Sequence, residues 1–281
     1  MSFDEKTHPP GQGAVSYGSY LCVPQLTSLQ QLVSEPGHHD EMLFIIVHQT
    51  YELWFKQLLH ELDTIGEMMR AGHALAAGRL VNRCVEIQKV LVRQVAVIET
   101  MTPMDFLAFR DKLQPASGFQ SAQFREFEYA LGIRDAGYLK NYESDNESRE
   151  RLEGRLAAPP VPEAFFALLR DRGFDAPPLP LDADDDARAA IRETRVAAVS
   201  RLYAEFEAHY DLFMLAEALI EMDQQLMLWR QRHVVMVERV IGGRRGTGGS
   251  SGAGYLKTTL EKRAFPELWD LRTSMSVHHS Y

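Results

Sequence analysis

The chain has 281 residues, of which 45% are hydrophobic, so it can bury a substantial core. Its formal charge of -9 argues against a nucleic-acid surface or an anionic membrane as the main partner. The two cysteines lie far apart in the sequence, support neither a disulfide scaffold nor a thiolate zinc site, and fit a reducing compartment. The N-terminus is polar, and the longest wholly apolar run, residues 42–47, is far short of a membrane span. We therefore expect a cytoplasmic protein that acts on small molecules or protein partners.

Helical periodicity runs along nearly the whole chain, without the alternating pattern of strands. Residues 1–33 are expected to form a loose N-terminal arm. A first helix is predicted from Asp40, as its N-cap, to about Met69, because apolar residues recur there every three or four positions. A second helix with one apolar stripe is predicted over about 79–100.

The middle of the chain contains shorter elements. Thr102 followed by Pro103 is a strong start signal for a short helix to Leu113, and the sequence PASG then interrupts it. A further helix is predicted over 119–132, and residues 134–160 are expected to be mostly surface. Residues 161–173 read as one more short helix.

The last long helix is predicted over about 186–241, and if it is divided, the break is expected near Ser200. The proline-rich, acidic segment before it is the best linker candidate. It does not separate two domains, because so long a helix cannot bury its apolar stripe without the earlier helices. From Leu215 to Val240 the apolar residues form a heptad-like seam, which indicates a single all-α helical bundle over residues 1–281.

Two histidines interrupt apolar faces. His233 occupies a seam position whose neighbours in register are apolar, and His48 shares a face with Phe44, Tyr51 and Phe55. Each one alone is explained by a core histidine hydrogen-bonded to a carbonyl group. Two such histidines on different helices instead favour a site between the helices.

The metal chemistry of such a site stays open at this point. The Glu-x-x-His pairs of di-iron bundles and the HExxH motif of zincins are not found as helical motifs in the sequence. A site with two histidines and one carboxylate is compatible with the sequence, because its ligands can come from distant segments. A haem is the other option, since it needs one axial histidine and a wide apolar slot.

The glycine-rich loop over 242–256 suggests close approach of the backbone to a ligand. Its spacing fits neither a Walker A loop nor a dinucleotide fingerprint, so a flexible linker or another ligand role remains. Thr247 between two glycines reads either as a turn residue or as an exposed hydroxyl. Arg110 beside apolar residues reads either as a paired arginine or as a fork for a carboxylate.

Several motifs together resemble the tryptophan 2,3-dioxygenases, haem enzymes that open the indole ring of L-tryptophan. They are YGSYL (17–21), SEPGHHDEMLFIIVHQTYELW (34–54), TPMDFLAFR (102–110), PASGFQSAQFR (115–125), LWRQRH (228–233) and RRGTGGSSG (244–252). The resemblance implies a haem-dependent dioxygenase with one haem b per subunit, O₂ as co-substrate and N-formyl-L-kynurenine as product. It also implies a homotetramer in which the arm reaches a neighbouring subunit's site.

The resemblance further implies roles for individual residues. His233 would be the axial iron ligand, His48 the distal histidine at the indole N–H, and Ser117 a serine near the haem. Arg110 would hold the substrate carboxylate and Thr247 its amino-acid end, so that residues 242–256 form an active-site loop over the substrate. The other implied substrate-binding positions are Phe44, Ile45, Ile46, Val47, Phe106, Tyr17, Tyr20 and Leu21.

Two substitutions and two alternatives qualify this hypothesis. Phe106 and Phe124 stand where some family members have tyrosine, so two hydroxyls are missing. The alternatives are a non-haem iron oxygenase and a non-catalytic helical binding protein, in which the two histidines are core residues and the glycine-rich loop is a linker.

Overall fold

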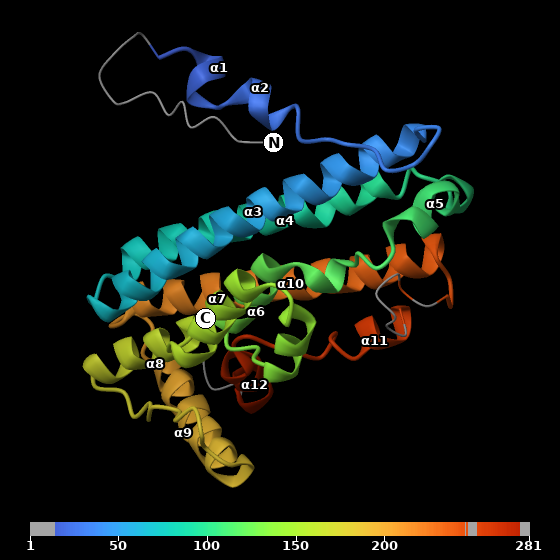
Figure 1. The fold of residues 1–281 in the computed structure, drawn as a ribbon. Helices are drawn as coiled ribbons and strands as arrows, with labels where there is room; N and C mark the ends of the chain where they lie inside the picture. Colours follow the sequence, from blue (N-terminus) through green and yellow to red (C-terminus); the bar gives the residue numbers. More distant parts are fainter. Residues whose placement is uncertain (1–14, 245, 247–251, 276–281) are drawn as a thin grey trace.

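The computed structural model describes residues 15–244, 246 and 252–275, and every regular element within these ranges is helical (Figure 1). The prediction of an all-α, single-domain fold is confirmed. The α-helices are α1 (Tyr17–Tyr20), α2 (Val23–Leu26), α3 (His39–Arg70), α4 (Ala74–Ile98), α5 (Pro103–Arg110), α6 (Ala122–Ala130), α7 (Asn146–Ala157), α8 (Val161–Asp171), α9 (Asp185–Ala204), α10 (Tyr210–Val240), α11 (Ala253–Lys257) and α12 (Pro266–Ser274). Three short 3₁₀ helices are η1 (Asp111–Leu113), η2 (Gly118–Gln120) and η3 (Ala136–Tyr142).

Three long helices, α3, α4 and α10, form the frame of the molecule (Figure 1). The tight turn at residues 71–73 contains Gly72 with a φ of 81°, a conformation that favours glycine, and it returns the chain so that α4 lies against α3. Helix α10 packs along α4. This arrangement leaves the C-terminal half of α10 facing α3, where the two unusual histidines lie.

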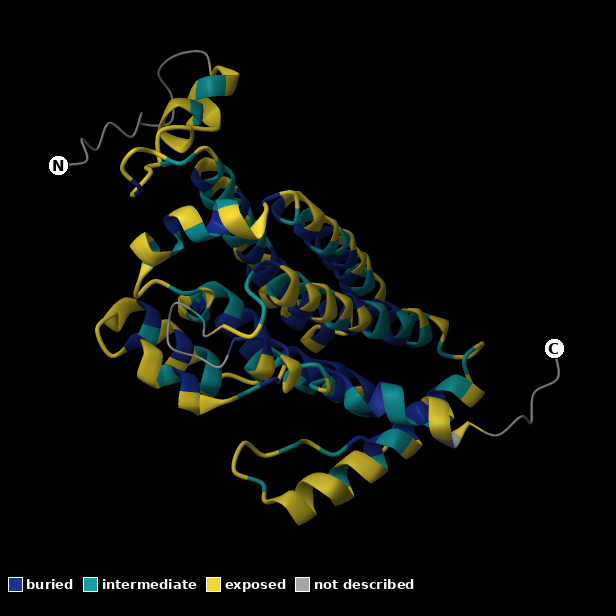
Figure 2. Ribbon diagram, turned by 90° about the vertical axis from the view of Figure 1, so that its right-hand side faces the viewer, coloured by how far each residue is buried: buried dark blue, intermediate teal, exposed yellow. Residues whose placement is uncertain are grey.

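The core lies between these three helices, where their dark blue inner faces meet in Figure 2. Leu62 of α3, Val81 of α4 and Leu219 of α10 are at most 1% exposed. Burying a side chain of this size contributes about 2 kcal/mol. The apolar stripes predicted from the sequence therefore meet in one core, which extends to the last helix through Leu271.

The outer helices attach to this frame through packing and buried charges. Helices α6 and α8 pack on α3, and α12 packs on α9. Arg195 of α9 is buried and pairs with Glu163 of α8 at 2.7 Å and with Glu267 of α12 at 3.6 Å. Because a buried charge is costly without a partner, this network holds the three helices in one arrangement.

Several predicted boundaries differ from the observed ones. Helix α3 begins at His39, because the ring of His38 accepts the hydrogen bond from the Asp40 backbone N–H at 3.3 Å and serves as N-cap. Helix α4 begins at Ala74 instead of about 79, because the turn after α3 is short and Ala74 is already buried. The predicted start of α5 is confirmed by a capping box between Thr102 and Asp105.

Other segments contain helices that the sequence did not predict, or divide a few residues from the expected place. The segment 134–160 is mostly exposed, as expected, but it contains η3 and α7 and buries Tyr142 and Leu152 against α6. The long C-terminal helix is divided after Ala204, a few residues beyond the expected break near Ser200, so α9 can turn away from α10 (Figure 1). The end of the predicted glycine-rich loop over 242–256 is helical, because α11 begins at Ala253, and α12 had no prediction.

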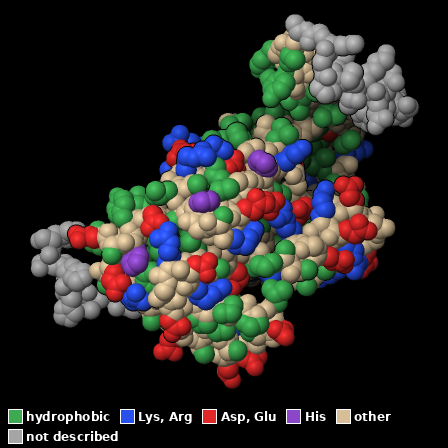
Figure 3. All heavy atoms as spheres, turned by 90° about the vertical axis from the view of Figure 1, so that its left-hand side faces the viewer, with side chains coloured by type: hydrophobic (Ala, Val, Ile, Leu, Met, Phe, Trp, Pro, Cys, Tyr) green, Lys and Arg blue, Asp and Glu red, His purple; other side chains and the backbone are tan. Residues whose placement is uncertain are grey.

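The N-terminal arm, expected to be loose, contains the short helices α1 and α2. It extends away from the body, and apolar side chains gather on its surface in Figure 3. Tyr17 and Tyr20 are 79% and 76% exposed. Throughout the described ranges, each helix is either too short or too polar to span a lipid bilayer.

Candidate active site

A cavity opens between the long helices at the end where α5 and α11 lie. Its volume is about 290 Å³. Residues of α3, α4, α5, α6, α10 and α11 line it, together with η2 and the described ends of the glycine-rich loop. Most of the lining side chains are apolar or aromatic, as in a pocket for a large planar ligand.

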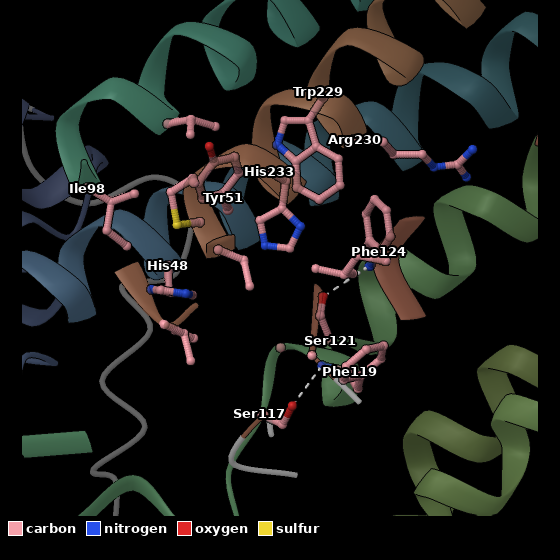
Figure 4. A pocket seen from close by; sticks show the side chains of 18 of the residues that line it. His48, Tyr51, Ile98, Ser117, Phe119, Ser121, Phe124, Trp229, Arg230 and His233 are labelled. Carbon is pink, nitrogen blue, oxygen red and sulfur yellow. Dashed lines mark hydrogen bonds between the residues drawn. The ribbon is translucent and has the colours of Figure 1, made fainter. Parts of the chain in front are cut away.

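His233 enters this cavity from α10, with its ring pointing into the open space (Figure 4). Trp229, one turn earlier on the same helix, stacks on the ring at 5.1 Å between centroids and 13° between planes. Burial, followed by the charge of His48, lowers the pKa of His233 to about 4. Among the described residues, no hydrogen-bond partner reaches the ring. The imidazole is therefore neutral, and its lone pair is available to a ligand of the cavity.

His48 faces the same cavity from α3, across from His233 (Figure 4). Its Nδ1 lies 2.7 Å from the backbone carbonyl of Phe44, which can only accept, so Nδ1 carries the proton. Burial lowers the pKa of His48 below 6.5, although the carbonyl of Phe44 and the charge of Glu52 oppose this effect. In the neutral ring, Nε2 is consequently a hydrogen-bond acceptor.

An aromatic wall surrounds His48. The Phe44 ring lies 4.1 Å from the His48 ring and stacks with Phe106 at 5.6 Å. Phe109 closes this group from α5, at 5.5 Å from Phe106. These rings belong to a second, smaller core cluster, which makes one side of the cavity both rigid and apolar.

The wall facing His233 is built by residues 117–121 (Figure 4). Ser117 caps η2 by accepting a hydrogen bond from the Phe119 backbone N–H at 3.4 Å, and Gln120 returns a bond to the Ser117 N–H. Ser121 caps α6 in the same way, accepting from the Phe124 N–H at 3.2 Å. These caps fix the backbone that presents Ser117 to the cavity.

Both described ends of the glycine-rich loop reach the cavity, through Arg244, Gly246 and Gly252. Gly252 has a φ of 62°, and a Cβ there would lie 2.7 Å from the Arg244 backbone oxygen. A glycine is thus required where the two ends of the loop approach each other. Thr247, and with it the predicted contact to the amino-acid end of the substrate, lies outside the described residues.

Of the predicted substrate-binding run in α3, Phe44 and His48 line the cavity, whereas Ile45, Ile46 and Val47 do not. Positions four apart share a helix face, and the intervening residues point elsewhere. Val47 is buried in the second core cluster, and Ile46 is 43% exposed. Proximity in sequence to His48 is therefore a poor guide to contact with the cavity.

Phe106, Ser117 and His233 also line the cavity, as expected. Arg110 ends α5 four residues after Phe106, on the same face of that helix, with a side chain only 12% exposed. Its Nη1 lies 4.0 Å from Asp111, and it is not among the residues that line the cavity of this chain. The arm residues Tyr17, Tyr20 and Leu21 are exposed and do not line it either.

Sequence reasoning missed several cavity residues. Trp229 had a signal, because it precedes His233 by four positions on the apolar seam. Arg125, Glu128 and Arg230 had none, since charged side chains on a helix normally indicate solvent, yet all three are buried beside the cavity. In the part of the chain that the structure describes, no group of three or more His, Cys, Asp or Glu side chains could hold a metal ion.

Comparison with known proteins identifies relatives over nearly the whole chain. The family model described as Tryptophan 2,3-dioxygenase matches residues 1–176 and 162–275. A protein of that name from a Nocardioides species is 46% identical over 275 residues, covering 94% of this chain and 96% of its own. Proteins of the same name from Anaeromyxobacter sp. (strain K) and Caulobacter vibrioides are 45% and 40% identical, covering 93% of this chain and 97% and 98% of their own. The chain belongs to the tryptophan 2,3-dioxygenase family.

Proposed function

We propose that this chain uses a haem to cleave the pyrrole ring of L-tryptophan with O₂, giving N-formyl-L-kynurenine, the first step of tryptophan degradation by the kynurenine pathway. Membership of the family supports the reaction. The observation that carries the proposal is the placement of His233, a neutral imidazole that faces an apolar cavity opposite a second histidine.

The residues present fit a haem b. A metal-binding histidine must be neutral, and burial keeps His233 in that form. The cavity beside it is lined by aromatic and aliphatic side chains from several helices, as a flat apolar macrocycle requires. His233 would hold the iron, Trp229 would keep its ring in one orientation, and Ser117 would lie near the macrocycle. When bound, haem iron supplies the activation of O₂.

His48 would orient the indole ring. Its Nε2 accepts hydrogen bonds because Nδ1 is committed to the Phe44 carbonyl. The indole N–H is a donor only, so it would bind Nε2 of the neutral histidine. Phe44 and Phe106 would enclose the ring, and together these contacts supply the orientation that brings the reacting bond to one place.

The amino-acid end of the substrate would be held by Arg110 and Thr247. Arg110 shares a helix face with Phe106, and an arginine fork binds a carboxylate in two places. Phe106 and Phe124 also line the cavity, and their phenyl rings donate no hydrogen bond. Both residues would therefore contact the ligands of the cavity only through apolar packing.

We further infer a homotetramer in which the arm of one subunit completes the site of another. The exposed side chains of Tyr17 and Tyr20 in α1 and of Leu21 after it support this assembly, because the described part of the chain leaves them uncovered. A cytoplasmic location is supported by the free cysteines, of which Cys22 is exposed and Cys84 is buried.

The test is the visible spectrum of the purified protein, with and without dithionite and CO. We expect a Soret band that is lost in His233→Ala, and formation of N-formylkynurenine when L-tryptophan is added in air. A haem-free protein that contains iron and oxidises tryptophan would indicate the non-haem alternative. A colourless, iron-free and inactive protein would leave only a binding role.

A further inference from the structure

Three buried charged side chains lie beside the cavity, on the side where Phe124 and Trp229 lie. Arg230 of α10 and Arg125 and Glu128 of α6 have side chains at most 6% exposed. The Glu128 carboxylate bonds both arginines, through Oε1 to Arg230 Nη2 at 2.6 Å and through Oε2 to Arg125. One carboxylate cannot accept from all the N–H groups of two arginines, so each guanidinium keeps donors for other partners.

The other terminal nitrogen of Arg230, Nη1, reaches the backbone of a third segment. It donates to the carbonyl oxygens of Thr259 at 3.2 Å and Lys262 at 3.0 Å. Thr259 and Lys262 directly follow α11, and Tyr255 and Leu256 of α11 line the cavity together with Thr259. We call residues 252–262 the C-terminal wall. A single guanidinium therefore joins α10, α6 and the C-terminal wall.

The same network supports the wall from its other side. The Arg125 guanidinium lies 3.6 Å from the centroid of the Tyr138 ring, which contacts Tyr255 edge-on at 6.5 Å. Tyr255 also contacts Phe119 edge-on at 5.1 Å. The wall is thus held between Arg230 and the aromatic side chains of η2 and η3.

We propose that Arg230 is a positioning residue for the reaction, which fixes the C-terminal wall of the cavity, and that Glu128 and Arg125 hold Arg230 in place. The inference rests on the proposed function for its effect on tryptophan binding. The geometry of the guanidinium gives the physical reason. Its planar fork reaches one carboxylate and two carbonyls at once, whereas an ammonium group presents a single point of charge.

A second contact between the C-terminal wall and α10, an ion pair at the surface, provides a matched control. Lys257 of the wall pairs with Glu238 of α10 at 2.6 Å, but these side chains are 55% and 44% exposed. Exposed pairs contribute little to stability, whereas a buried charge that loses its partner is costly. Both contacts join α10 to the C-terminal wall: the Arg230 guanidinium does so from a buried position, and the Lys257–Glu238 pair does so at the surface.

The experiment compares Arg230→Met, Arg230→Lys and Glu128→Gln with Glu238→Gln and the parent protein. The first readout is hydrogen exchange of the amides of residues 252–262, which does not depend on haem or activity. The second is KM and kcat for L-tryptophan in the haem-loaded fraction, with the Soret band as a check on the His233 site.

We expect faster exchange in the wall and a KM raised about tenfold in Arg230→Met, within the range that side-chain networks transmit between sites. Arg230→Lys and Glu128→Gln should show the same changes to a smaller extent, and Glu238→Gln should match the parent. The Soret band should be unchanged in all of the variants. A variant whose defect is merely structural would instead lose haem, while the KM of its haem-loaded fraction would stay parental.

Parental exchange and KM in Arg230→Met would overturn the inference, as would equal effects of Arg230→Met and Glu238→Gln. If Arg230→Met does not fold, parental values in both Arg230→Lys and Glu128→Gln would overturn it. A parent protein that does not oxidise tryptophan would contradict the proposed function alone, since hydrogen exchange would still decide whether Arg230 fixes the wall.

Discussion

At the scale of single residues, the hydrogen bond from His48 Nδ1 to the Phe44 carbonyl decides what the ring can do. It commits one nitrogen to the backbone and leaves Nε2 as an acceptor while the ring is neutral. The pKa of His48 is lowered, chiefly by burial, so the neutral form is maintained at pH 7.

His48→Ala should therefore lower kcat/KM for L-tryptophan about tenfold, the effect of losing one hydrogen bond of about 1.4 kcal/mol. In the parent, kcat/KM should also fall on the acid side, at a pH below 6.5, as the ring gains a proton at Nε2 and ceases to accept. The alanine variant should lack this acid limb in its pH profile. 1-Methyl-L-tryptophan has no indole N–H. With this substrate the difference in kcat/KM between the parent and His48→Ala should therefore be smaller. An unchanged profile in His48→Ala would contradict the assignment.

Arg110→Ala should raise the KM for L-tryptophan strongly. The carboxylate of the bound substrate then loses a charge-assisted pair with the arginine, worth on the order of 2 to 4 kcal/mol. Steady-state kinetics on the haem-loaded variant measures the effect. Arg110→Lys keeps the positive charge but loses the planar fork, so its KM should lie between those of the parent and Arg110→Ala. Tryptophan turnover at the parental KM in Arg110→Ala would show that the carboxylate is bound elsewhere.

At the scale of elements, the start of α3 is tied to the end of the arm through Glu41, which is 1% exposed. Its carboxylate accepts hydrogen bonds from the Val33 N–H at 2.7 Å, the Ser34 N–H at 3.1 Å and the Ser34 hydroxyl. Burial raises the pKa of Glu41, but these hydrogen bonds outweigh it, and the pKa is lowered overall.

Glu41→Gln should lower the free energy of unfolding by about 2 kcal/mol at pH 7, the size of a buried hydrogen bond to a charged group. The pKa of Glu41 is lower in the folded than in the unfolded chain, so this stabilisation is complete above the unfolded pKa of about 4.3 and is lost as the pH falls through the folded pKa. Urea unfolding at pH 7 and pH 3 should show the difference from the parent shrinking at the lower pH. Glu67→Gln, an exposed position on the same helix, is the control. An equal loss at both pH values would contradict the role of the charge.

At the scale of the whole molecule, the arm stands away from the body with apolar side chains uncovered (Figure 3). Removing residues 1–28 keeps the hydrogen bonds from Val33 and Ser34 to Glu41, so it should not unfold the chain. We expect it to shift sedimentation towards smaller assemblies and to raise KM for L-tryptophan several-fold, because apolar area buried between subunits stabilises them by about 25 cal/mol per Å². A truncated protein with parental sedimentation and KM would contradict the shared site.

Periodicity alone was sufficient to predict the helical fold, because the stripes of α3, α4 and α10 are long and each one needs a partner. It failed for α7, whose few apolar residues lie among charges, and whose burial depends on α6. Boundaries moved by a few residues where a cap or a turn decided them, as His38 did for α3. Local signals therefore predicted which segments are helical better than where each helix ends.

For the cavity, the sequence by itself determined the unusual histidines and the glycine-rich loop, because a polar ring on an apolar seam and a cluster of glycines are visible in one dimension. Only the tertiary structure decided that His48 and His233 face one cavity, and that Ile45, Ile46 and Val47 turn away from it. Only the tertiary structure, too, decided that Arg125, Glu128 and Arg230 are buried. The physical reason is that burial of a charge depends on partners from three separate segments, and no local pattern records which distant carbonyls or carboxylates a guanidinium will reach.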